Sequence, residues 1–297
     1  VMLAENPRAI NAEGARRRVE SRIRMRHTRP MQSRLVDALR MPLAPVALLW
    51  SDERPDDAVQ FQEGKWGCVI WHLAAAAKGR TAVADDKTFG CLGGAVGLGF
   101  GNAYESWPGG IECFYGFLSN GFEQPADPSD SESLHGRRAA LHRDGERYVK
   151  SPRLVEKFVR TLPIARIPTR YVVFKPLAHV DTDRETPQVV VFVVHPDQLS
   201  ALIVMANYDR DDNENVITPF GAACHQIGIF PYREAASDRP RAVLGLSDIS
   251  ARKHVKRQLG DHLMTMAVPW KRFLELEDNV EGSFLQTDQW KVLVEGG

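Results

Sequence analysis

Cysteine is scarce in this sequence, and it has no long apolar segment. Four cysteines among 297 residues are too few for the disulfide scaffold of a small secreted protein, so we expect a reducing, cytoplasmic location. The uninterrupted apolar runs, such as Val189 to Val194, are far shorter than the roughly 20 residues that cross a bilayer, so no membrane span is predicted. The chain also has no net charge, since its 38 basic residues balance 38 acidic ones. No overall field therefore draws the chain toward nucleic acid or a lipid surface.

The balanced total hides an arginine-rich N-terminus. Residues 1–40 contain ten arginines and four acidic residues, and no apolar core of a signal peptide follows them. A run of charge on a helix usually faces water, so we predict that residues 1–30 form an extension outside the folded core. Nucleic-acid binding through this extension is not favoured, because no aromatic side chains accompany the arginines to stack on bases.

The rest of the chain alternates between β-branched runs and helical patterns. Val46 to Trp50 and Val189 to Val194 are typical of buried strands. Gln198 to Ala206 has a helical pattern that follows a Pro-Asp start. This alternation predicts an α/β fold, with a mixed sheet and flanking helices.

A polar stretch divides the α/β region. Pro-Ala-Asp-Pro and Ser-Asp-Ser-Glu-Ser follow Gln124 closely, a composition that favours a loop or linker. We therefore predict a single domain over residues 31–297. Its two closely coupled lobes, at about 31–123 and 150–297, are expected to be joined by a polar loop at 124–149.

Common catalytic and nucleotide-binding motifs are missing. The sequence has neither a Walker phosphate-binding loop nor a Gly-x-Ser-x-Gly nucleophile elbow. Gly97 to Asn102 imitates a dinucleotide fingerprint, but asparagine replaces its last glycine, which favours close backbone packing over phosphate binding. Asp209 to Asn215 alternates like a calcium loop without the turn glycine or the bidentate carboxylate. We interpret that segment as a polar surface loop.

Small residues surround two of the four cysteines. Cys91 lies among Gly90, Gly93 and Gly94, and Cys224 follows Gly-Ala-Ala. An iron–sulfur cluster needs thiolates with room for inorganic sulfide, together with backbone amides that donate to sulfur. Small residues supply both, so these three glycines are candidate cofactor-binding positions.

The cysteine spacing itself leaves several alternatives open. The candidate metal ligands are Cys68, Cys91, Cys113 and Cys224. They are single and far apart in the sequence, so they could equally be buried apolar side chains. A mixed zinc site is also conceivable, because His72 lies one helical turn after Cys68 and His225 directly follows Cys224.

The order of several motifs resembles the family catalogued as domain of unknown function 169. The similar segments are Pro45 to Leu49, Trp66-Gly67-Cys68, Gly90-Cys91-Leu92-Gly93-Gly94, Leu98 to Gly101, Val189 to Gln198, Ala222-Ala223-Cys224 and Met266 to Pro269. The resemblance covers most of Arg34 to Leu276. It implies an architecture and an emphasis on Cys68, Cys91 and Cys224, with Cys113 the least securely matched.

Together, the cysteine contexts and the resemblance favour an iron–sulfur protein. We predict that the four cysteines converge on a cluster, expected to be of the 4Fe-4S type, with sulfur atoms within roughly 6 to 7 Å of one another. Such a cluster would transfer electrons to a redox partner, or an open iron would activate a small-molecule substrate as a Lewis acid. The alternative hypothesis is a metal-free protein with buried structural cysteines that binds a small molecule. Its cleft would be lined by Trp66, Trp71, Trp107 and Phe114.

Overall fold

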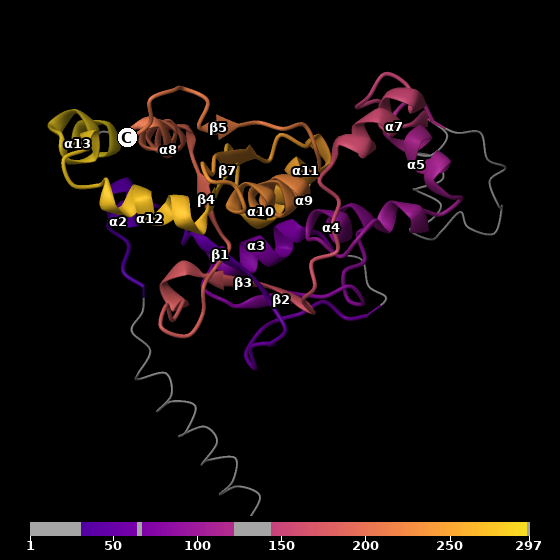
Figure 1. The fold of residues 1–297 in the computed structure, drawn as a ribbon, viewed down its shortest axis with the longest axis horizontal. Helices are drawn as coiled ribbons and strands as arrows, with labels where there is room; N and C mark the ends of the chain where they lie inside the picture. The colour runs from indigo at the N-terminus through magenta and orange to yellow at the C-terminus, as the bar shows by residue number, and fades with distance from the viewer. Residues whose placement is uncertain (1–30, 64–66, 122–143, 296–297) are drawn as a thin grey trace, which may run out of the picture.

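A mixed seven-stranded sheet runs through the centre of the molecule (Figure 1). The computed structural model describes residues 31–63, 67–121 and 144–295, so the predicted extension at 1–30 and most of the predicted polar loop lie outside the described residues. The strands are β1 (Val46–Ser51), β2 (Ala82–Ala84), β3 (Tyr171–Pro176), β4 (Val189–Val194), β5 (Val216–Ile217), β6 (Ala242–Gly245) and β7 (Met264–Pro269). Their order across the sheet is β2-β3-β1-β4-β7-β6-β5. Neighbouring strands are antiparallel except for the parallel pair β5 and β6.

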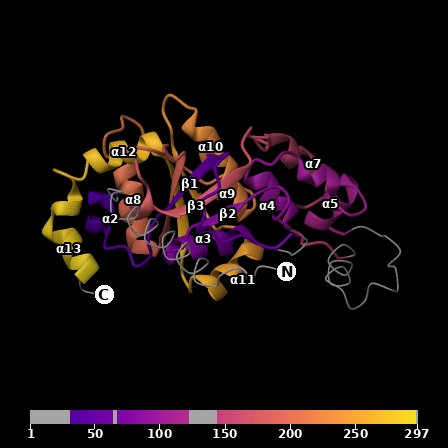
Figure 2. The same cartoon turned by 90° about the horizontal axis from the view of Figure 1, so that it is seen from below.

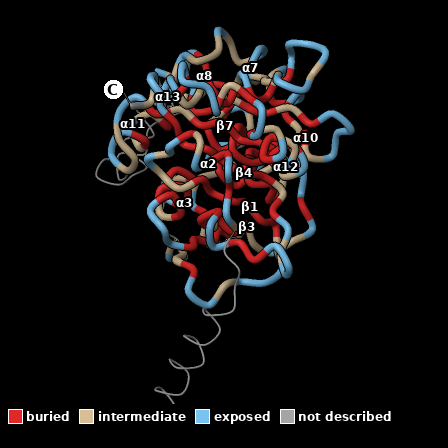
Figure 3. The backbone as a smooth tube through the Cα atoms, turned by 90° about the vertical axis from the view of Figure 1, so that its left-hand side faces the viewer, coloured by how far each residue is buried: buried red, intermediate tan, exposed pale blue. Residues whose placement is uncertain are grey.

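Side chains of the central strands alternate between two buried layers, because successive residues of a strand point to opposite faces. In β4, Val189, Val191 and Val193 belong to one core, whereas Val190 and Phe192 belong to the other. Figure 3 shows the buried residues gathered along these strands. Since both faces are covered, β4 has a continuous apolar sequence, and the strand predicted there is confirmed.

Helices cover both faces of the sheet, which confirms the predicted α/β class. The first core is covered by α3 (Val69–Ala77), α4 (Leu92–Gly97), α5 (Ile111–Leu118), α7 (Pro152–Thr161), α9 (Ala223–Ile227), α10 (Ile229–Ala235) and α11 (Ile249–Gln258). The second core is covered by α2 (Arg34–Leu39), α8 (Pro196–Asn207), α12 (Trp270–Asp278) and α13 (Asp288–Glu295). Figures 1 and 2 place α5 and α7 at one end of the molecule and α13 at the other. No helix in the described ranges is long and apolar enough to span a bilayer.

Strands from both predicted lobes form this one sheet. β1 comes from the first lobe but lies between β3 and β4 of the second. Val46 pairs with Pro176 on one side and with Val191 on the other. The two lobes therefore share a sheet and both cores.

The glycine-rich segment contains the short helix α4. A Cβ atom at Gly97 would lie 2.6 Å from the carbonyl carbon of Cys224, and a Cβ atom at Gly94 would overlap the Phe89 ring. Contacts this short do not occur between real atoms. The close backbone approach that the glycines allow is therefore the packing of α4 against α9.

Candidate functional site

A cavity of about 350 Å³ opens between the end of α5, α7 and the starts of α9 and α11. Six separate stretches of the chain contribute to it, so it exists only in the folded molecule. Its lining residues are Tyr104, Leu118, Glu146, Arg147, Tyr148, Phe158, Phe220, Gly221, Ala222, His225, Ser247, Asp248, Ile249 and Ser250. Its volume is in the range of natural small-molecule sites.

Tyr104 and His225 form a fixed hydrogen-bonded pair in the cavity wall. His225 Nδ1 accepts the backbone N–H of Ala222 at 3.1 Å, and burial lowers the pKa of the imidazole to about 4. The neutral ring therefore carries its proton on Nε2, which donates to the Tyr104 hydroxyl oxygen at 2.9 Å. Tyr104 is 3% exposed and stacks on Phe114 with ring centroids 4.0 Å apart. Its own hydroxyl hydrogen points away from His225 and can be donated to a ligand.

A second polar group in the wall joins Glu146, Tyr148 and Ser250. The Ser250 hydroxyl donates to Glu146 Oε1 at 2.8 Å, so its oxygen accepts from the Tyr148 hydroxyl, also at 2.8 Å. The segment carrying Glu146 and Tyr148 is held in place by α5, because their backbone N–H groups donate to Phe117 and Leu118. Burial raises the pKa of Glu146, and the charge of Asp248 adds to that effect.

Asp248 connects the starts of two helices beside the cavity. Its Oδ1 atom accepts the backbone N–H of Ser250 at 2.8 Å, which caps α11. Its Oδ2 atom accepts the N–H of Ala223, the first residue of α9, at 3.3 Å. Asp248 therefore fixes the position of α9 relative to α11.

Apolar side chains also line the cavity, and two of them are exposed at its edge. The rings of Phe158 and Phe220 lie 5.2 Å apart, and Phe220 is 57% exposed. Ile249 is 64% exposed beside them. Two large apolar side chains are thus left in water at the opening, where the hydrocarbon part of a ligand could cover them.

Three of the four predicted cysteine ligands lie on elements that pack together. Cys68 immediately precedes α3, Cys91 immediately precedes α4, and Cys224 is within α9. Both α3 and α4 contact α9, and the Cys224 thiol donates to the backbone carbonyl of Gly93 at 2.9 Å. The three thiols are not among the groups that line the cavity. They lie behind the wall that Ala222 and His225 form.

Electrostatic effects link the same three cysteines. The pKa of the Cys68 thiol is raised to about 12, mainly by burial, with smaller contributions from the charges of Cys91 and Asp248. Burial also raises the pKa of Cys224, with added effects from Cys91 and Cys68. The Cys113 thiol instead donates to the Gly109 carbonyl at 3.1 Å.

Cys113 differs from the other three cysteines in its electrostatic surroundings. Burial raises the pKa of its thiol, and the charged group that adds to this effect is Glu112. Cys113 also lies on α5, at the end of the molecule that α5 and α7 form (Figures 1 and 2).

The remaining predicted site residues have separate places. In the part of the chain that the structure describes, no three His, Cys, Asp or Glu side chains are grouped to hold a metal ion. This holds for the zinc alternative and for Cys68, Cys91 and Cys224 alike. His72, a candidate ligand in the zinc alternative, donates from Nε2 to the Val83 carbonyl at 3.1 Å. Gly90 is exposed and Gly93 is half-buried, and a Cβ atom at Gly93 would lie 3.7 Å from the Tyr104 hydroxyl oxygen.

Three of the aromatic residues predicted to line a cleft, Trp71, Trp107 and Phe114, are not among the described residues that line this cavity. Trp66 lies outside the described residues. Trp71 packs on Phe61, with ring centroids 5.6 Å apart, and Trp107 packs on Phe114 at 4.9 Å. The cavity is lined by other aromatic side chains, which the sequence analysis did not single out.

Comparison with known proteins confirms the resemblance seen in the sequence. The model of the family DUF169, described as an uncharacterised ArCR family, matches residues 34–279. This range contains every residue that lines the cavity and all four cysteines. No curated protein and no solved structure matches the chain.

Proposed function

Since the chain belongs to the DUF169 family, whose description assigns no activity, we propose a function from the cavity itself: the protein binds a small organic molecule there. The observation that carries the proposal is the mixed lining of the cavity. Positioned hydrogen-bonding groups lie in the same lining as two phenylalanines and Ile249. A few fixed polar groups within a largely apolar pocket are the usual composition of a small-molecule site.

Among the polar groups of the lining, the Tyr104 hydroxyl is the one expected to select the ligand. Its oxygen is occupied by His225, and its ring is held by Phe114. Its pKa is raised by burial and by nearby negative charge, so the group stays protonated. A hydrogen-bond donor that is already oriented costs little conformational entropy on binding. We therefore expect the ligand to present an oxygen or another acceptor to Tyr104.

Benzyl alcohol is a suitable neutral probe because it combines a ring with one hydroxyl group. Its affinity should fall about fivefold in Tyr104→Phe, since one hydrogen bond is worth about 1 kcal/mol and the packing of the ring is retained. Titration followed by ligand-observed NMR measures the two dissociation constants.

Tyr115→Phe is the matched control, because Tyr115 is a buried tyrosine on α5 that does not line the cavity. It should leave the affinity for benzyl alcohol unchanged. The proposal fails if benzyl alcohol, benzamide and benzylamine all show no saturable binding to the wild-type protein, or if Tyr104→Phe and Tyr115→Phe bind benzyl alcohol alike.

A second candidate function is an iron–sulfur cluster held by Cys68, Cys91 and Cys224. The observation that favours it is the position of these cysteines on three packed elements, where the charge of Cys91 raises the pKa of the other two thiols. Three thiolates would leave one iron open to water or to a substrate, which suits Lewis-acid chemistry as well as electron transfer.

Metal content distinguishes this second candidate from buried structural cysteines. Cys91→Ser is expected to remove most of the bound iron and sulfide and the broad visible absorption of anaerobically purified protein, because a hydroxyl replaces a thiolate ligand. Cys113→Ser is the control, since the pKa of its thiol responds to Glu112 instead. Iron-free wild-type protein from an anaerobic preparation, or equal iron in wild type and Cys91→Ser, would contradict the cluster hypothesis.

A further inference from the structure

We propose that the cavity selects a small organic ammonium ion, with the amine at Glu146 and the hydrocarbon part against Phe158 and Phe220. This inference rests on the proposed small-molecule function and names the chemical class of the ligand. It stands on the placement of two carboxylates and two phenylalanine rings in the lining of one cavity.

Glu146 is the carboxylate that can receive the amine. Its Oε1 atom accepts the Ser250 hydroxyl, which leaves Oε2 for a ligand. Asp248, by contrast, uses both of its oxygens to accept backbone N–H groups of α9 and α11. Asp248 therefore contributes negative charge, while Glu146 supplies the contact.

The charges around Glu146 favour a cation over an anion. Burial raises the pKa of Glu146, and the added effect of Asp248 is larger than the opposite effect of Lys253. Burial likewise raises the pKa of Tyr148, and the charges of Glu146 and Asp248 raise it further. An ammonium ion relieves this repulsion between negative groups, whereas a carboxylate ligand increases it.

The nearby cationic side chains lie toward solvent. Arg147 lines the cavity but is exposed, and its Nε atom donates to the Asp144 carbonyl at 3.3 Å. Lys253 on α11 is also exposed. Exposed charges are screened by water and salt more strongly than half-buried ones. The aromatic rings beside Glu146 add a favourable surface for a cation, since the face of a ring carries negative charge.

Three probes of similar shape test the inference in the full chain. Benzylamine, benzyl alcohol and benzoate differ mainly in the charge next to the ring. Benzylammonium cannot accept the Tyr104 hydroxyl as benzyl alcohol can, but its charged hydrogen bond to Glu146 is stronger than that neutral one. We therefore expect benzylamine to bind about fivefold more tightly than benzyl alcohol, and benzoate to bind more weakly than either. The preference for benzylamine should shrink between 50 mM and 500 mM salt, chosen to span about a threefold change in screening length.

Glu146→Gln identifies the residue responsible. Benzylamine should then lose about tenfold in affinity, while benzyl alcohol should change less than twofold, because glutamine keeps the size and hydrogen-bonding oxygen but removes the charge. Glu112→Gln, on α5 and outside the cavity lining, is the matched control. The inference is overturned if benzyl alcohol binds and benzylamine binds no more tightly, or if Glu146→Gln leaves benzylamine binding unchanged. Failure of all three probes to bind would instead overturn the small-molecule function itself.

Discussion

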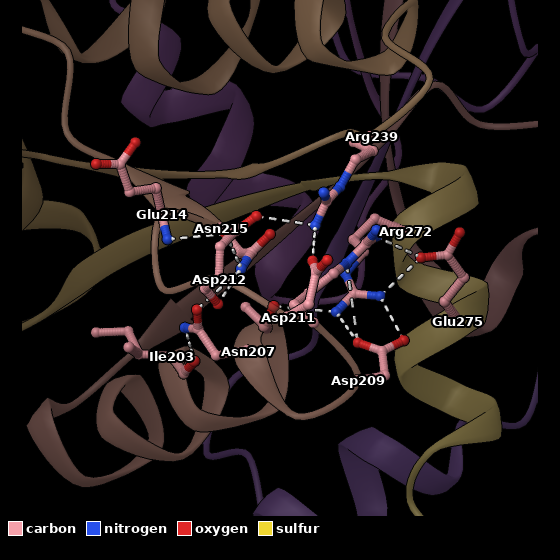
Figure 4. A network of polar contacts seen from close by, with 12 residues as sticks. Ile203, Asn207, Asp209, Asp211, Asp212, Glu214, Asn215, Arg239, Arg272 and Glu275 are labelled. Carbon is pink, nitrogen blue, oxygen red and sulfur yellow. Dashed lines mark hydrogen bonds and ion pairs between the residues drawn. The ribbon is translucent and has the colours of Figure 1, made fainter.

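Replacing Arg272 with alanine is expected to lower the free energy of unfolding by about 3–5 kcal/mol, the usual cost of removing one partner from a buried ion pair. Arg272 is 1% exposed, and its guanidinium donates to Asp209 at 2.9 Å and to Glu275 at 2.7 Å (Figure 4). It also donates to the backbone carbonyl of Ala206 in α8. The substitution leaves two neighbouring carboxylates without this cation and opens a cavity between α8 and α12. Urea unfolding followed by circular dichroism measures the loss.

Arg239→Ala is the comparison that makes this result informative. Arg239 also pairs with two carboxylates, Asp211 and Asp212, but its side chain is half exposed. Surface ion pairs contribute about 0–1 kcal/mol, so this variant should unfold almost like the wild type. Equal losses in Arg239→Ala and Arg272→Ala would show that burial is not the cause.

Acid should reduce the difference between wild type and Arg272→Ala. The hydrogen bond from Arg272 lowers the pKa of Asp209 from 3.8 to about 2. A carboxyl group with a lowered pKa in the folded state stabilises the fold above its ordinary pKa, and that contribution is lost as the pH falls through about 2. The stability difference between the two proteins is therefore expected to narrow between pH 4 and pH 2.

Gly97→Ala should destabilise the protein by about 3 kcal/mol, at the upper end of the usual cost of overpacking a core. The added methyl group would lie 2.6 Å from the carbonyl carbon of Cys224 and 2.8 Å from its oxygen. These are backbone atoms, so the strain is relieved only if α4 moves away from α9. The contact is equally tight from the other side, because a Cβ atom added at Gly228 would lie 2.0 Å from the carbonyl oxygen of Gly97. The midpoint of urea unfolding reports the loss.

Gly93→Ala is the control for this prediction within the same helix. Its Cβ atom would meet only the Tyr104 hydroxyl oxygen, at an ordinary 3.7 Å, and alanine favours a helix more than glycine does. We expect a change of less than about 1 kcal/mol. If Gly97→Ala were as stable as Gly93→Ala, direct contact between the backbones of α4 and α9 would not be the reason for the glycines.

The parts of the fold that could be predicted from sequence depend on local patterns. The valines of β4 and the apolar run that begins at Val46 are typical of strands that are buried on both faces. The helix after Pro196 has its start signal within the sequence itself. The order of the strands could not be predicted, because no local signal determines that β1 pairs with both β3 and β4.

The site was harder to predict because its contacts join distant residues. Glu146 and Ser250 are 104 positions apart, and Tyr104 and His225 are 121 apart. Asp209 shows the same difficulty. It lies in the loop that we interpreted as polar surface, but it pairs with the buried Arg272, 63 positions later in the chain. One local signal was available, because Asp248 stands directly before the helical pattern of α11, where an aspartate side chain accepts the backbone N–H of Ser250 and caps the helix. That signal predicts the start of α11 but not the cavity beside it.

The central position of β1 determines when the sheet can be completed during synthesis. The chain must grow by more than a hundred residues after β1 before its partners β3 and β4 are made. Until then both edges of β1 are unpaired, and pairing must wait for contacts that are distant in the chain. The nascent segment that carries β1 therefore depends on protection from aggregation until β3 and β4 follow.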